Sequence, residues 1–155
     1  MPIIWVTGDT HGDWIHRVNM DSFPEQREMS KDDYVIILGD FGIWRDSPQQ
    51  RWYLNWLEEK HFTTLFIDGN HENYDILDSY PVEEWHGGKV HFIKPSIIHL
   101  MRGQVFDIDG LKFFTFGGAA RHDISDGVLE IDDPRVKEWR DDPDKMYRIN
   151  HISWW

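Results

Sequence analysis

Three short apolar runs mark the first half of the chain, at residues 2–7, 34–38 and 63–68. The runs are rich in β-branched and aromatic side chains, and each is only five or six residues long. Runs of this length and composition are typical of strands buried on both faces of a sheet. A glycine and then a polar residue follow each run, which predicts a sharp turn at the end of each strand.

The polar residues after the three runs are evenly spaced. Asp40 follows Asp9 by 31 residues, and Asn70 follows Asp40 by 30. Each interval suits one strand–helix–strand crossover, which makes consecutive strands parallel. We therefore expect all three polar residues at the same edge of the sheet, which is where open α/β sheets bind their ligands.

The second interval contains a well-marked helix. Ser47 is a good N-cap, Pro48 suits the first helical position, and Gln50 completes a capping box. An apolar stripe at helical spacing follows and predicts packing against the core; its members are Trp52, Tyr53, Trp56 and Leu57. The first interval predicts a helix near 13–20 and then a polar loop that contains Pro24.

The pattern changes after residue 80. Short strand candidates follow one another at 90–93, 96–100, 104–108 and 111–116. Asp109-Gly110, between the last two, is a strong hairpin signal, so we expect this half to be antiparallel. Residues 117–120 predict a tight turn. The polar, acidic stretch 121–148 predicts loop with one short helix near 134–140.

Composition limits the class of protein. The chain has 155 residues, of which 40% are hydrophobic, so we expect a single domain over 1–155 with a true core. No apolar stretch reaches the length of about 18 residues that predicts a membrane span. The N-terminus lacks the pattern of a signal peptide. The absence of cysteine excludes disulfides and thiolate metal sites and favours a cytoplasmic location.

The charge of the chain bears on its partners. The formal net charge is −12, and a surface that acidic repels polyphosphate backbones, so we expect no general nucleic-acid binding. Carboxylates gathered at one place repel each other unless a cation lies among them. Hard divalent metals are the usual cations at such places.

The expected sheet edge collects five side chains that carry metal-binding atoms: Asp9, His11, Asp40, Asn70 and His71. Their oxygen and imidazole nitrogen atoms suit divalent Mn, Fe, Co, Ni or Zn. Asp9 and His11 point the same way in an extended segment and can share one ion, and Asp40 can bridge to a second. Two ions about 3.5–4 Å apart can clamp a phosphate. The competing interpretation is that Asp9, Asp40 and Asn70 are plain turn and cap formers.

Three segments at these turns resemble the calcineurin-like metallophosphoesterase superfamily, in its order and over roughly residues 2–120. The segments are Gly8-Asp9-Thr10-His11-Gly12, Gly39-Asp40 and Gly69-Asn70-His71-Glu72. The resemblance implies an α/β fold, a layered α/β/β/α sandwich around two mixed sheets. It also implies a divalent-metal-dependent phosphoesterase that hydrolyses a small phosphate mono- or diester with a metal-bound hydroxide.

The resemblance assigns a role to each matching residue. Asp9 and His11 bind the first of two ions, Asp40 bridges both, and Asn70 binds the second and contacts the substrate. His71 lies by the leaving group as proton donor or charge stabiliser. Arg121, just after a Gly-Gly turn, is a further candidate for binding the phosphate, although a surface salt bridge is the commoner role for such a residue.

The chain also departs from the family pattern. The residues after Asp40 and after Glu72 differ from those of the Ser/Thr protein phosphatases of the superfamily, so that activity is not implied. The further histidines that complete both metal shells in the family are missing. Only His122 and His151 offer substitutes.

We therefore expect a C-terminally truncated member of the family, with the C-terminal part of the second sheet missing. The alternative is a catalytically incomplete metal-binding or interaction fragment of such an enzyme. Trp154 and Trp155 close the sequence, and large aromatic side chains need burial. This aromatic end is accordingly a candidate surface for self-association.

Overall fold

The computed structural model describes residues 1–43, 45–117 and 124–152. Contacts divide the chain into two compact units, Met1–Gly117 and Gly118–Trp155, and each is described by itself. The expectation of one domain over 1–155 stays a prediction, because compactness alone does not establish which segments fold independently.

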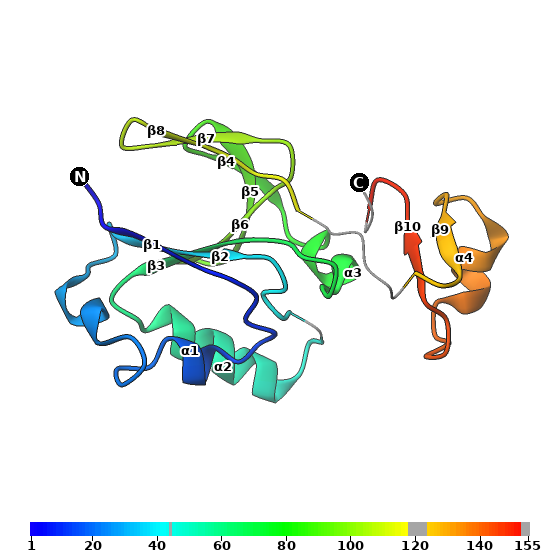
Figure 1. Cartoon of the computed structure of the whole chain (residues 1–155), viewed down its shortest axis with the longest axis horizontal. Helices are drawn as coiled ribbons and strands as arrows, with labels where there is room; N and C mark the ends of the chain where they lie inside the picture. The colour runs from blue at the N-terminus through cyan, green and yellow to red at the C-terminus, as the bar shows by residue number, and fades with distance from the viewer. Residues whose placement is uncertain (44, 118–123, 153–155) are drawn as a thin grey trace. The chain divides into compact units, whose positions relative to one another are not determined.

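The first unit is built on a six-stranded sheet with the strand order β1-β2-β3-β6-β5-β4 (Figure 1). Its strands are β1 (Ile4–Thr7), β2 (Tyr34–Leu38), β3 (Thr63–Ile67), β4 (Val82–Trp85), β5 (Gly88–Lys94) and β6 (Ile97–Leu100). β1, β2 and β3 pair in parallel, which confirms the prediction from the three apolar runs. Their carboxyl ends therefore lie at one edge of the sheet.

β6 corrects the prediction that the second half of the sheet is purely antiparallel. It pairs antiparallel with β5 but parallel with β3, in a register that sets Leu65 opposite Ile98. The reason is the tight turn before β6, which reverses the chain once more after β5. β4, which the sequence analysis did not predict, forms a hairpin with β5 through a turn at His86 and Gly87, both at positive φ.

Helices cover one face of this sheet. α1 (Trp14–Arg17) is shorter than the helix expected near 13–20, and a 3₁₀ turn (Pro24–Glu28) follows where a loop was expected. α2 (Pro48–Glu58) confirms the predicted helix and its cap, because the Ser47 side chain accepts a hydrogen bond from the Gln50 backbone N–H at 3.1 Å. α3 (Tyr74–Leu77) begins three residues after His71.

The buried face of α2 differs in part from the predicted stripe. Leu54 and Leu57 are buried, whereas Trp52 is 57% exposed. Tyr53 and Trp56 pack against the core from its margin. The stripe was therefore wrong at Trp52, because the face that meets the sheet is centred on the leucines and turns that indole towards solvent.

Two apolar clusters hold the layers together. One lies between the sheet and the helices and includes Trp14, Phe41 and Leu57. The other lies on the opposite face, where Phe106 belongs to the hairpin of β7 (Val105–Ile108) and β8 (Leu111–Phe114). Figure 1 shows this hairpin and the helices on opposite sides of the sheet. The first unit is thus a mixed α/β structure in three layers, and the β7–β8 hairpin confirms the Asp109-Gly110 signal.

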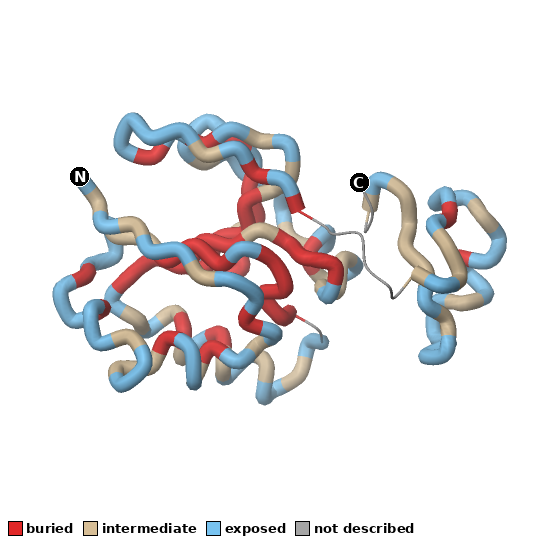
Figure 2. The backbone as a smooth tube through the Cα atoms, viewed as in Figure 1, coloured by how far each residue is buried: buried red, intermediate tan, exposed pale blue. Residues whose placement is uncertain are grey.

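The central strands are the buried ones, as the red segments in Figure 2 show. β1 is an exception to the expectation that residues 2–7 form a fully buried strand. In the part of the chain that the structure describes, β1 is one of the two edge strands of the sheet, and Trp5 and Val6 are 42% and 55% exposed. An outer strand has a neighbour on one side only, which explains the difference.

The second unit contains β9 (Gly127–Leu129), α4 (Pro134–Trp139) and β10 (Tyr147–Ile149). α4 confirms the helix expected near 134–140, and the Asp133 side chain caps it by accepting from the Arg135 N–H at 2.9 Å. β9 and β10 pair in parallel and were not predicted. Among the described residues, none of the helices has both the length and the apolar character needed to cross a bilayer.

Candidate metal centre

Three turns at the carboxyl edge of the sheet carry the residues that the sequence singles out. Asp9 follows β1, Asp40 follows β2, and Asn70 and His71 follow β3. Because these strands are parallel neighbours, the turns lie next to one another. The regular spacing in the sequence thus becomes a cluster in space.

Asp9, His11 and Asp40 form the centre of this cluster. One ligand atom from each lies within 4.8 Å of the other two. The His11 Nε2 is 3.6 Å from an Asp40 carboxylate oxygen. Asp40 is buried, whereas Asp9 and His11 are exposed, so the cluster is open on one side. Two carboxylates and one imidazole are a donor set that fits a borderline-hard divalent ion.

Backbone hydrogen bonds fix the first turn on the second. The Asp40 carbonyl accepts from the N–H groups of Thr10 at 3.2 Å and His11 at 2.7 Å. Both His11 and Asp40 have positive φ, at 48° and 40°, a conformation that non-glycine residues seldom adopt. Unfavourable backbone conformations of this kind concentrate at functional sites, where the surrounding bonds hold them in place.

The turns approach each other more closely than side chains permit. A Cβ on Gly42 would lie 2.2 Å from the backbone nitrogen of Gly12, and one on Gly69 would lie 2.0 Å from the Asp40 carboxylate. Glycine at these two positions is therefore a steric requirement of the cluster.

Asn70 and His71 adjoin the cluster from the third turn. The His71 backbone N–H donates to the Asp40 carboxylate at 2.8 Å, and the His71 and His11 rings are 5.7 Å apart between centroids. Asn70 is buried at 8% exposure. The structure thus brings together all five residues named from the sequence, while the individual roles assigned to them stay predictions.

Glu72 ties the third turn to the second, a function that the sequence analysis did not assign to it. Its carboxylate accepts hydrogen bonds from the N–H groups of Phe41, Gly42 and Ile43, at 2.5, 3.2 and 3.4 Å. Burial raises the pKa of Glu72 to about 7, although these N–H groups act to lower it. The only hint of this role in the sequence is that Glu72 directly follows His71, a candidate site residue.

A cavity of about 560 Å³ begins at the same turns. Its lining includes Gly12, Gly42, Arg45, Gln49 and Tyr53. Arg45 is exposed and follows Asp40 by five residues. The cavity therefore offers a cation and polar groups next to the turns that carry His11 and Asp40, in a chain that is otherwise strongly acidic.

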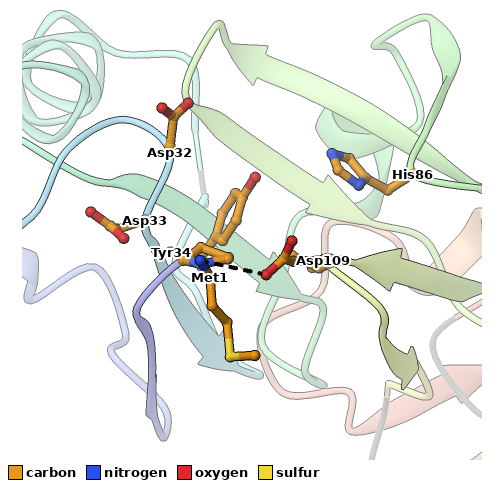
Figure 3. Close-up of a pocket in the computed structure, with 8 residues that line it drawn as sticks. Met1, Asp32, Asp33, Tyr34, His86 and Asp109 are labelled. Carbon is orange, nitrogen blue, oxygen red and sulfur yellow. Dashed lines mark ion pairs between the residues drawn. The ribbon is translucent and has the colours of Figure 1, made fainter.

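A second cavity, of about 530 Å³, lies at the other end of the strands (Figure 3). Asp32, Asp33 and Asp109 line it, and Asp109 pairs with the N-terminal amine at 3.8 Å. Met1 precedes β1 and Asp33 precedes β2, so this cavity is remote from the carboxyl edge. Its acidic lining does not suit a phosphate.

Some candidate site residues named from the sequence have no place in the described cluster. Arg121, His122 and the terminal Trp154 and Trp155 lie outside the described residues. His151 is described, but it belongs to the second unit. The expectation that His122 or His151 substitutes for missing ligands therefore stays a prediction.

Comparison with known proteins agrees with the geometry. The family model described as calcineurin-like phosphoesterase matches residues 3–155. The chain has no match among the curated proteins or among the solved structures.

Proposed function

The chain belongs to the calcineurin-like phosphoesterase family, and from this premise we propose that it hydrolyses a small phosphate mono- or diester with two divalent metal ions at the carboxyl edge of its sheet. The observation that carries the proposal is the convergence of Asp9, His11 and Asp40 within 4.8 Å. When bound there, a divalent ion supplies a Lewis acid for the phosphoryl oxygens and lowers the pKa of water.

Each residue has a role in this proposal. Asp9 and His11 would hold one ion, Asn70 would hold the other, and Asp40 would be a ligand of both. His71 donates a proton to the leaving group or stabilises its charge. The contact between the His71 N–H and Asp40 supports this assignment, because it fixes the turn that carries both Asn70 and His71. Manganese is the ion that we would add first in the activity assay.

We propose that the neighbouring cavity binds the organic part of the substrate. Its volume of about 560 Å³ is within the range of small-ligand sites, roughly 300–1,000 Å³. Arg45 supplies a positive charge there and would attract an anionic ester. Arg121 stays a further candidate for contact with the phosphate.

The test is hydrolysis of a chromogenic phosphodiester and a chromogenic phosphomonoester by the 155-residue chain with added Mn²⁺. We expect Asp40→Asn to lower the rate by at least about 100-fold, because it weakens the residue common to both ions. Asp21→Asn, a substitution at an exposed carboxylate outside the site, is the matched control and should act as wild type. Equal rates in wild type and Asp40→Asn would contradict the proposal.

One alternative has an observation in its favour. Among the described residues, a single group of acidic and histidine side chains, Asp9 with His11 and Asp40, is placed to hold an ion. That number of donors suits a metal-binding or interaction module without turnover. One Mn²⁺ per folded chain and no hydrolysis of either ester would favour this alternative.

We also propose that the chain is cytoplasmic, that it does not bind nucleic acids in general and that it self-associates through its aromatic C-terminal end.

A further inference from the structure

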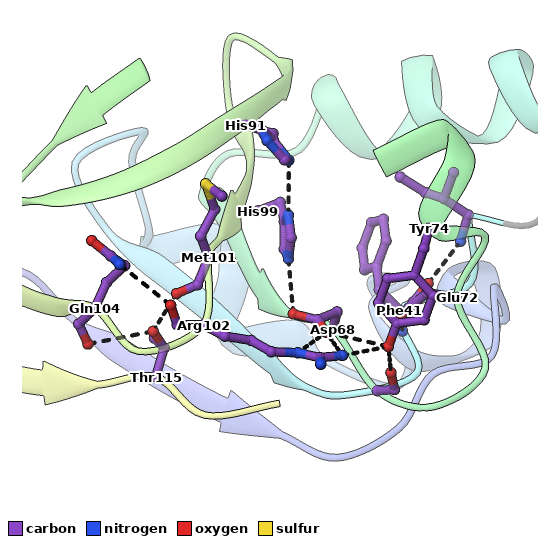
Figure 4. A network of polar contacts seen from close by, with 12 residues as sticks. Phe41, Asp68, Glu72, Tyr74, His91, His99, Met101, Arg102, Gln104 and Thr115 are labelled. Atoms are coloured by element: carbon purple, nitrogen blue, oxygen red, sulfur yellow. Dashed lines mark hydrogen bonds and ion pairs between the residues drawn. The ribbon is translucent and has the colours of Figure 1, made fainter. Parts of the chain in front are cut away.

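Asp68 is a buried carboxylate directly before the turn that carries Asn70 and His71. It is 2% exposed, and its two oxygens have different partners (Figure 4). One oxygen lies 3.1 Å from His99 Nε2, and the other accepts hydrogen bonds from the Arg102 guanidinium. A buried carboxylate with such partners is held firmly, because losing them would leave its charge uncompensated.

Tyr74 links this pair to the turn itself. Its hydroxyl donates to the backbone carbonyl of Gly69 and accepts from Arg102 Nη2 at 2.5 Å. Gly69 is also the residue that lies against the Asp40 carboxylate. A continuous chain of contacts therefore runs from Arg102 through Tyr74 to the turn between β3 and α3.

Arg102 lies in the segment that follows β6, and Thr115, directly after β8, fixes this segment on both sides of Arg102. The Thr115 hydroxyl donates to the Met101 carbonyl at 2.5 Å, and the Gly103 N–H donates to the Thr115 carbonyl at 2.8 Å. Gln104 Nε2 donates to the Arg102 carbonyl at 3.3 Å. The backbone that carries Arg102 is thus held by hydrogen bonds, and the Arg102 side chain is 7% exposed.

The protonation states agree with these contacts. Burial acts to raise the pKa of Asp68, but His99 and Arg102 outweigh it and hold that pKa below its ordinary value. Burial and the Asp68 charge raise the pKa of Tyr74, so its hydroxyl keeps the proton that it donates to Gly69. Asp68, Tyr74 and Arg102 are not themselves among the candidate metal ligands.

We propose that Arg102 and Tyr74 are positioning residues for the metal centre: together with Asp68 they fix the turn 69–72 and so set Asn70 and His71 against Asp40. The inference deepens the proposed function and rests on it for the identity of the ligands. It adds a support that reaches the centre from β6, a strand that carries none of the ligands.

The first test is Mn²⁺ affinity, measured by the electron paramagnetic resonance signal of free Mn²⁺. Tyr74→Phe keeps the ring and removes the hydroxyl, and Arg102→Gln removes the charge. We expect each to weaken Mn²⁺ binding by about tenfold or more, the usual effect of losing an outer support of a metal ligand. Tyr74→Phe carries the test if Arg102→Gln does not fold.

Two controls separate positioning from general loss of stability. Tyr34→Phe removes a hydroxyl at the opposite end of the parallel strands and should bind Mn²⁺ as wild type does. Val90→Ala opens the fully buried core on the other face and should lower stability without changing Mn²⁺ affinity in the folded chain. Unchanged affinity in Tyr74→Phe, or an equal loss in Val90→Ala, would overturn the proposal.

A second readout does not depend on metal. Hydrogen exchange of the backbone amide of His71, whose N–H is bonded to Asp40, is measured in chelator. We expect exchange about tenfold faster in Tyr74→Phe and, after correction for global stability, unchanged in Val90→Ala. If wild type bound no Mn²⁺, the proposed function would fail, while this exchange result would still decide the positioning role either way.

Discussion

At the scale of single residues, the candidate metal centre depends on glycines that let two backbones meet. Gly42 lies against Gly12 at a φ of +104°, so both its backbone conformation and its surroundings exclude a side chain. Gly69 meets the Asp40 carboxylate in the same way. These contacts bring together the turns that bear His11, Asp40 and Asn70.

Gly42→Ala is therefore expected to destabilise the chain by about 3 kcal/mol or more, from steric overlap added to the cost of positive φ. The measurement is the free energy of unfolding in urea. Gly103→Ala is the matched control, because Gly103 also has a positive φ, +69°, but no atom within 4 Å of an added Cβ. It should cost about 1–2 kcal/mol. Equal losses in the two variants would contradict the steric argument.

Glu72 makes a second residue-scale contribution, to the free energy of unfolding, and the size of this contribution depends on pH. Its pKa in the fold, about 7, is above the ordinary 4.5, so folding favours the protonated form. The stability due to this shift is fully present below pH 4.5 and is lost as the pH rises through 7. Its size is at most about 3 kcal/mol.

Glu72→Gln should accordingly flatten the dependence of unfolding free energy on pH between about 4.5 and 7 in metal-free protein. Urea unfolding in chelator at several pH values measures the slope. Glu25→Gln, at an exposed position in the 3₁₀ turn, should keep the wild-type slope. The same slope in both variants would mean that Glu72 is not the titrating group.

At the scale of elements, α2 shows how a helix is oriented by the surface that it covers. Its cap at Ser47 is local and follows from the sequence, whereas its rotation about its axis does not. Leu57 faces the sheet at 1% exposure, while Trp52, the larger side chain, is 57% exposed. The sheet accepts the leucine face because the aromatic side chains of Trp14 and Phe41 already fill the adjoining core.

Leu57→Ala should thus destabilise the chain by about 2–5 kcal/mol, the cost of a cavity in a packed core. Trp52→Ala removes more atoms but should cost less than about 1 kcal/mol, because most of the indole already contacts solvent. Thermal and urea unfolding compare the two directly. A larger loss in Trp52→Ala would mean that the helix is rotated from the orientation described.

At the scale of the whole molecule, the candidate metal centre links metal binding to folding. Asp9 and His11 follow β1 and Asp40 follows β2, so these candidate ligands converge only when the sheet has formed. An ion that binds the folded chain alone stabilises it, by about 2.7 kcal/mol at 100 times its dissociation constant.

Mn²⁺ is therefore expected to raise the melting temperature and a chelator to reverse the rise. Asp40→Asn should lose most of this shift, whereas Asp21→Asn should keep it. Ionic strength is held constant with NaCl, because a net charge of −12 also gains stability from simple screening. A shift of the same size in Asp40→Asn would assign the stabilisation to screening rather than to the centre.

Much of the site followed from local pattern. A strand, a glycine and a polar residue recur three times at near-equal intervals, and short crossovers make such strands parallel. This pattern alone predicts Asp9, Asp40 and Asn70 at one edge of the sheet. The cap of α2 and the β7–β8 hairpin followed in the same way, because a cap and a two-residue turn depend on neighbouring residues alone.

The remainder depended on which distant segments pair. β6 lies beside β3 rather than only beside its hairpin partner, and this choice carries Arg102 to Asp68. It also leaves β1 at one edge of the sheet, with β2 as its neighbour among the described strands and with Trp5 exposed.

The sequence by itself therefore determined which residues stand at the carboxyl ends of the first three strands, because strand, turn and crossover are encoded over short distances. Only the tertiary structure decided what holds those residues in place. Glu72 reaches the turn after β2, and Arg102 supports the turn after β3, through contacts between residues 30 or more positions apart. Such contacts are set by sheet order and register, which depend on packing of the whole core rather than on any local pattern.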